Sequence, residues 1–251
     1  MESKRLLECL DQDYRRLRSV AAEANLAAVV PTCPEWTMAD LVRHVGAVYL
    51  HKVECMRLGT NPEVWPPAGL NDEEPVALLD RAYTALAAEF GKRGAEAPAF
   101  TWYDPDQTVG FWIRRMAQET VIHRVDAELT IAAPLAPIPV DLAEDGVDEF
   151  LVAFIEFGAK AWLDDFEDVL ATADGRSIRL ETPSAAWLIR PTPEGIDVRV
   201  SDVDSAAAVV RADPADLLLW VWNRMADDTV TISGDAALIA HLRQIFATGS
   251  V

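Results

Sequence analysis

The stretch Arg115-Met-Ala-Gln-Glu-Thr-Val-Ile-His-Arg-Val-Asp-Ala-Glu128 decides how the first half of this chain folds. It lies in a proline-free segment, from about Thr108 to Ala132, in which apolar residues recur at helical spacing. Three earlier segments show the same spacing, and the four together predict a bundle of amphipathic helices. The earlier helices are expected from Ser3 to about Asn25, from an N-cap at Thr37 to about Leu58, and through the run Leu78 to Phe90.

The second half of the chain has a different pattern. Three prolines within six residues mark a linker between about Ala132 and Asp141. We therefore expect two domains, residues 1–133 and 141–251. After a helix from about Leu142 to Leu163, short alternating runs at 177–181, 186–190, 196–200, 207–211 and 229–232 predict strands, with an apolar helix opening at Pro214 and a helix at the end. This predicts a two-domain α+β protein whose smaller C-terminal domain holds a mostly antiparallel sheet.

Composition excludes several classes of partner. Among 251 residues, 41 acidic against 22 basic side chains give a formal charge of −19, which repels nucleic acid and anionic membranes. No apolar run reaches the roughly 20 residues that a membrane span needs, and the first residues carry too many charges for a signal peptide. We therefore expect a cytoplasmic protein. Cys9, Cys33 and Cys55 are expected to be thiols, and Cys33, in a predicted loop, is a candidate for thiol chemistry.

One face of the fourth predicted helix holds side chains that could bind a metal. Trp112, Met116, Glu119 and His123 are spaced four, three and four residues apart, so they share one face with core residues. An inward carboxylate and imidazole are costly unless they are paired or bound to a metal. His44 lies on a comparable inward stripe of the second predicted helix. Two imidazoles and one carboxylate suit zinc or a similar divalent cation, with a position left for another ligand.

The same residues also fit a site without metal. Glu119 could pair with Arg115 or with His123, and His44 could be a core histidine with a backbone partner. A single Glu-x-x-x-His spacing is common by chance. Spacing alone therefore leaves the metal site and the hydrogen-bonded cluster both open.

Two motifs resemble a known family. The first is Cys33-Pro-Glu-Trp-Thr-Met-Ala-Asp-Leu-Val-Arg-His-Val-Gly46, a Trp-Thr pair followed after six residues by His. The second is the Glu-x-x-x-His of the opening stretch, with Asp126 three residues further on. Both are similar to motifs of the mycothiol-dependent maleylpyruvate isomerase family, whose N-terminal domain is a DinB-like four-helix bundle. That family binds zinc through the positions of His44, Glu119 and His123.

The resemblance extends into the second half and implies a function. Segments 187–196, 212–224 and 232–238 resemble the family's sterol-carrier-like C-terminal domain, and the family's catalytic arginine matches Arg224 by position. The implied activity is a metal- and mycothiol-dependent isomerase or thiol transferase acting on a small, possibly dicarboxylate, substrate. An arginine at a helix end is also favoured by the helix dipole alone. A zinc-dependent hydrolase and a non-enzymatic small-ligand-binding or regulatory protein remain alternatives.

Overall fold

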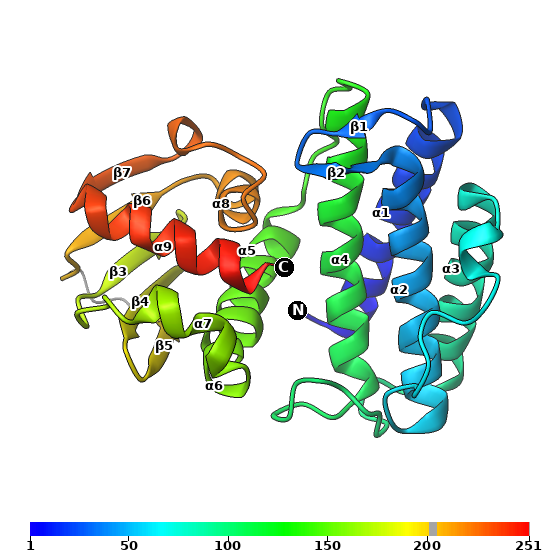
Figure 1. Ribbon diagram of the computed structural model, residues 1–251, viewed down its shortest axis with the longest axis horizontal. Coiled ribbons are helices and arrows are strands. Elements are labelled where there is room, and N and C mark those ends of the chain that lie inside the picture. Colours follow the sequence, from blue (N-terminus) through cyan, green and yellow to red (C-terminus); the bar gives the residue numbers. More distant parts are fainter. Residues whose placement is uncertain (201–204, 251) are drawn as a thin grey trace. The chain divides into compact units, whose positions relative to one another are not determined.

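Four long helices form the first part of the chain (Figure 1). The computed structural model describes residues 1–200 and 205–250, and it divides into two compact units, Met1–Ala136 and Pro137–Val251. In the first unit α1 packs mainly against α4, and α2 packs mainly against α3. The predicted bundle is confirmed. Its helices are α1 Ser3–Glu23, α2 Met38–Leu58, α3 Pro75–Lys92 and α4 Val109–Thr130, with a 3-10 turn η1 at Leu70–Asp72.

The start of α2 follows from its sequence. Thr37 is the N-cap, its side chain accepts a hydrogen bond from the Asp40 backbone, and the Asp40 side chain accepts one from the Thr37 backbone. Thr37 is thus the predicted N-cap, and with Asp40 it forms a capping box, which satisfies two backbone donors that the first turn leaves open. Gly46 then lets α3 approach, because a Cβ there would lie 3.0 Å from a side-chain atom of Leu78. The cap fixes where α2 begins, and the glycine sets how closely it packs on α3.

The segment before α2 was predicted as a loop, and the structure corrects this. Strands β1 Val29–Val30 and β2 Cys33–Thr37 form a short antiparallel hairpin. Thr32, at the turn, donates a hydrogen bond of 2.6 Å from its hydroxyl to the Asp126 carboxylate on α4. Strands this short show little alternation of apolar and polar residues, so the sequence pattern does not reveal them. The hairpin is held by this contact with a residue far away in the sequence.

A buried ionic network joins α1, α4 and the chain that leaves α4. The Arg124 guanidinium is fully buried and donates to Asp13 on α1 at 3.0 Å and to Glu128 at 2.8 Å. It also donates to the Ala136 carbonyl, while the Ala136 amide donates to Glu128. Arg16 adds a further hydrogen bond to Glu128 at 2.6 Å. Buried charges are tolerated when they are paired in this way, so the network fixes the end of the bundle.

The second unit holds a five-stranded sheet in the order β5-β4-β3-β6-β7. Among the strands of the described residues, only β3 and β6 pair in parallel, so the predicted mostly antiparallel sheet and the α+β class are confirmed. The strands are β3 Ile178–Glu181, β4 Ala186–Thr192, β5 Gly195–Val200, β6 Ala208–Arg211 and β7 Thr231–Gly234. The helices that follow β6 are α8 Pro214–Val221, the 3-10 turn η3 Asp227–Thr229 and α9 Ala236–Gly249.

The helix predicted from about Leu142 to Leu163 is present, but a π-helical stretch interrupts its α-helical geometry. The chain forms α5 Val140–Glu149, a π-helical stretch η2 Phe150–Glu156, α6 Gly158–Ala161 and then α7 Leu163–Leu170, a helix that the sequence pattern did not indicate. Phe150 on the π-helical stretch is buried and contacts Trp222 and Phe246, with ring centroids 4.6 and 5.2 Å away. These rings anchor the helical layer of the unit.

Two further sequence predictions concern the whole chain. All three cysteines lie in the described residues, and none forms a disulfide; Cys9 and Cys55 are buried, and Cys33 on β2 is partly exposed. Within the described residues, every helix is too short or too polar to cross a bilayer.

Replacing Arg124 tests the buried network. Arg124→Met should lower the free energy of unfolding by about 3–5 kcal/mol, because Asp13 and Glu128 would keep buried charges without their shared cation. Chemical denaturation of the full chain measures this. The control is Arg15→Met, which removes an exposed ion pair with Asp11 and should change stability by less than about 1 kcal/mol. Equal effects of the two substitutions would show that the network contributes no more than a surface pair.

Limited proteolysis tests the two-domain organisation. We expect the first cut between about Ala132 and Asp141, because linker residues such as Ala132 and Pro137 are exposed. The amide and the carbonyl of Ala136 are both hydrogen-bonded, which protects the backbone there. Cuts should therefore fall mainly after Ala136. A fragment starting near Asp141 should keep its circular dichroism spectrum. Cleavage at the chain ends alone would contradict an independent C-terminal domain.

Candidate metal centre

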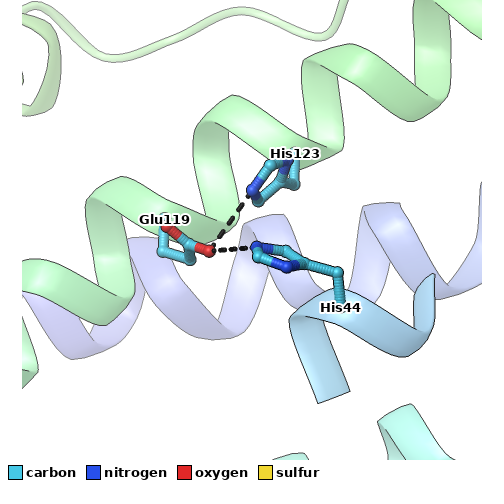
Figure 2. A group of neighbouring side chains, drawn as sticks. All are labelled: His44, Glu119 and His123. Atoms are coloured by element: carbon cyan, nitrogen blue, oxygen red, sulfur yellow. Dashed lines mark hydrogen bonds and ion pairs between the residues drawn. The ribbon is translucent and has the colours of Figure 1, made fainter. Parts of the chain in front are cut away.

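Three side chains from two helices converge on one point (Figure 2). Glu119 Oε1 on α4 lies 3.1 Å from His44 Nε2 on α2 and 3.2 Å from His123 Nε2 on α4. One ligand atom from each residue lies within 4.8 Å of the other two. His44 and Glu119 are partly exposed, and His123 is buried. The structure therefore brings together the three residues that the sequence singled out, with access from one side.

The spacing of these atoms fits a small divalent cation. Ligand atoms about 2.0–2.2 Å from a tetrahedral zinc ion lie about 3.3–3.6 Å from one another. The two measured separations from Glu119 Oε1 are slightly shorter than this. Two neutral imidazole nitrogens and a carboxylate oxygen form a common zinc donor set, and three protein ligands leave one position open. The residues present therefore fit zinc.

A second layer of contacts orients the imidazole of His123. Its Nδ1 lies 2.9 Å from the Asp126 carboxylate, which itself accepts the hydrogen bond from Thr32. A carboxylate partner on Nδ1 holds a ring proton there, so Nε2 is the nitrogen that a metal would bind once the proton it shares with Glu119 is displaced. The β1–β2 hairpin thus helps to hold a candidate ligand on α4 in place. One sequence feature indicated this role, the Asp three residues after His123.

Arg115 and Trp36 complete the surroundings. Arg115 lies one helical turn before Glu119 and donates to its second oxygen, Oε2, at 2.9 Å. The Trp36 ring on β2 lies 4.7 Å from the His44 ring and 6.1 Å from the His123 ring. Arg115 therefore fixes the carboxylate, and Trp36 restricts the imidazoles. Glu119 therefore pairs with Arg115, the partner that the alternative without metal named, as well as with the two histidines.

The electrostatics follow from burial and charge. Burial raises the pKa of the Glu119 carboxyl, but the two imidazoles and the Arg115 guanidinium lower it by more, so it lies well below its usual range. Burial lowers the pKa of His123, but the carboxylates of Glu119 and Asp126 outweigh burial and raise it to about 9. At neutral pH the carboxylate is ionised and His123 carries a proton. A metal bound to His123 must displace that proton.

Arg224 lies in the second unit, just beyond the end of α8. Its backbone amide donates to the Leu219 carbonyl and its Nη1 donates to the Trp222 carbonyl, each at 2.8 Å. Asn223 before it adopts a left-handed conformation, with φ of 59°, which turns the chain out of the helix. The catalytic role predicted for Arg224 stays a prediction.

Known proteins were compared with the chain by sequence and by fold. The family model of the mycothiol maleylpyruvate isomerase N-terminal domain matches residues 7–128, and the model of the family's C-terminal domain matches residues 141–241. No curated protein matches the chain.

Solved structures give the same fold. A crystal structure of the mycothiol-dependent maleylpyruvate isomerase is 15% identical, with a TM-score of 0.65 over 94% of this chain and 95% of that one. A histidine-to-alanine mutant of that enzyme is 14% identical, with a TM-score of 0.64 over the same shares. The two family models together span most of the sequence, and the chain therefore belongs to the mycothiol-dependent maleylpyruvate isomerase family.

Proposed function

We propose that this protein is a metal-dependent enzyme that uses mycothiol to isomerise, or transfer the thiol to, a small substrate. The observation that carries the proposal is the convergence of His44 Nε2 and His123 Nε2 on Glu119 Oε1. Family membership supports the thiol, because the similar crystal structure is that of a mycothiol-dependent enzyme. The expected metal is zinc, and the expected substrate is a small molecule such as a dicarboxylate.

The residues of the site have separate tasks in this proposal. A bound divalent cation would stabilise the thiolate form of a thiol at neutral pH. His44, Glu119 and His123 would hold it. Asp126 keeps the His123 ring in the required tautomer, and Arg115 keeps one Glu119 oxygen turned toward the histidines. A guanidinium such as that of Arg224 is suited to hold a substrate carboxylate through two hydrogen bonds.

Metal analysis tests the site directly. The purified full-length protein should carry about one zinc ion per chain, and His123→Ala should lose it, since two remaining ligands hold a cation poorly. His44→Ala and Glu119→Ala should act in the same way. Elemental analysis after dialysis measures the loss. The matched control is His51→Ala, which removes the other histidine of α2 and should leave the zinc content unchanged.

The contact between Asp126 and His123 allows a second test by metal analysis. Asp126→Asn should retain the three ligands but bind zinc about 10- to 100-fold more weakly, the usual effect of losing a histidine's carboxylate partner. Stoichiometric zinc in all three ligand variants would overturn the metal assignment.

Cobalt substitution tests the thiol and Arg224 separately. Mycothiol added to the cobalt-loaded protein should produce a sulfur-to-metal charge-transfer band, because the thiol is expected in the open position. Arg224→Met should keep that band and lower turnover of a dicarboxylate substrate by a few orders of magnitude, as expected when a charged two-point anchor is lost.

The possible outcomes separate the alternatives. An unchanged rate in Arg224→Met would remove this residue from the reaction without affecting the metal site. Turnover without any thiol would favour a zinc-dependent hydrolase. If mycothiol does not change the cobalt spectrum and no turnover is found, a small-ligand-binding protein is favoured.

A further inference from the structure

A lysine lies on the same face of α2 as the candidate ligand His44. His44, Val48 and Lys52 follow one another at four-residue spacing, which aligns them on one helix face, and all three are partly exposed. On α4 the order is reversed: Glu119 contacts His44, and Trp112, two turns earlier in the sequence, contacts Lys52. The two helices therefore run side by side in opposite directions, with Lys52 beyond the metal ligands.

The Lys52 ammonium has an unusual set of contacts for a partly buried cation. Its Nζ lies 4.9 Å from the Trp112 ring centroid and 3.1 Å from His51 Nδ1. In the described part of the chain it forms no ion pair with a carboxylate. Burial and the Lys52 charge lower the His51 pKa to about 4, so the His51 ring is neutral at pH 7 and can accept a hydrogen bond from Lys52 without supplying a negative charge.

A cation in this position needs an anion. Burial lowers the pKa of Lys52, and the charges of Cys55 and Glu119 offset this only in part. The nearby Arg115 guanidinium adds a second positive charge, and the carboxylate of Glu119 already serves Arg115 and the two histidines. This part of the α2–α4 face is thus locally positive in a chain whose formal charge is −19. Buried charges are ordinarily paired, so the missing partner is expected from a ligand.

We propose that Lys52, supported by the face of Trp112, binds a carboxylate of the small molecule whose reactive end lies at His44, Glu119 and His123. This deepens the proposed function and rests on it for the position of the reactive end. About 12 Å of helix rise separates His44 from Lys52, which suits an extended small molecule with an acidic group at the end away from the ligands. Lys52 is then a specificity-determining residue of the first unit itself.

Titration with maleate, a four-carbon dicarboxylate too short to reach the metal ligands from Lys52, tests the carboxylate subsite by itself in the zinc-loaded full-length protein. Lys52→Met keeps the apolar stem of the side chain but removes its charge, and it should weaken maleate binding about 10- to 100-fold, the usual loss for a charged hydrogen bond. Lys52→Arg should retain most of the affinity, because it keeps a cation beside Trp112. Isothermal titration calorimetry measures binding, and elemental analysis shows whether each variant keeps its zinc.

Lys4→Met is the matched control, since it removes the same charge from an exposed position on α1 and should leave maleate affinity unchanged. Lys52→Met should fold, because it keeps the apolar stem beside Trp112 and removes a partly buried charge that no carboxylate of the described residues pairs, and circular dichroism checks this. Equal maleate affinity in Lys52→Met and the unaltered protein, or no maleate binding at all, would overturn the inference. The zinc content tests the metal site separately. If maleate binding depends on the Lys52 charge but the protein binds no zinc, the carboxylate subsite stands and the metal site is wrong.

Discussion

A carboxylate that points inward from a helix must be matched by donors or cations, and Glu119 imposes this requirement on the N-terminal bundle. It is met by His44 from α2 and by Arg115 and His123 from α4. Because the partners come from both helices, the contact fixes the register of α2 against α4. Tyr49, five residues further along α2, adds a second link to α4 through a hydrogen bond of 2.5 Å with Thr120. The pairing of one acid thereby aligns two helices and concentrates donor atoms at one point.

The sequence predicted much of this centre but not how it is assembled. Helical spacing placed Glu119 and His123 on one stripe and His44 on another, and the Thr37–Asp40 capping box fixed where α2 begins. Periodicity reveals which face of a helix is buried, but it does not reveal which helix covers that face. His44 and Glu119 are 75 residues apart, so periodicity could offer them as a metal site, and only the resemblance to a family favoured that site over the alternative without metal.

The features that sequence reasoning missed depend on contacts across the fold. The β1–β2 hairpin is too short to show alternation, and it is anchored by the hydrogen bond from Thr32 to Asp126. The π-helical stretch within 150–156 keeps the chain helical, so its residues look like part of one long helix. Lys52 resembles an ordinary surface lysine in the sequence, because its position beside Trp112 follows from the antiparallel packing of α2 and α4.

The acidic surface and an anionic ligand are compatible because their electrostatic effects act over different distances. A formal charge of −19 repels anions, but at physiological ionic strength the repulsion between exposed charges is screened within about 8 Å. Partly buried groups are screened much less. On the α2–α4 face the nearest charges are therefore decisive, and there Arg115 and Lys52 outnumber the carboxylate of Glu119. An anion that reaches this face meets a local positive potential, which selects for acidic ligands more strictly than an evenly charged surface would.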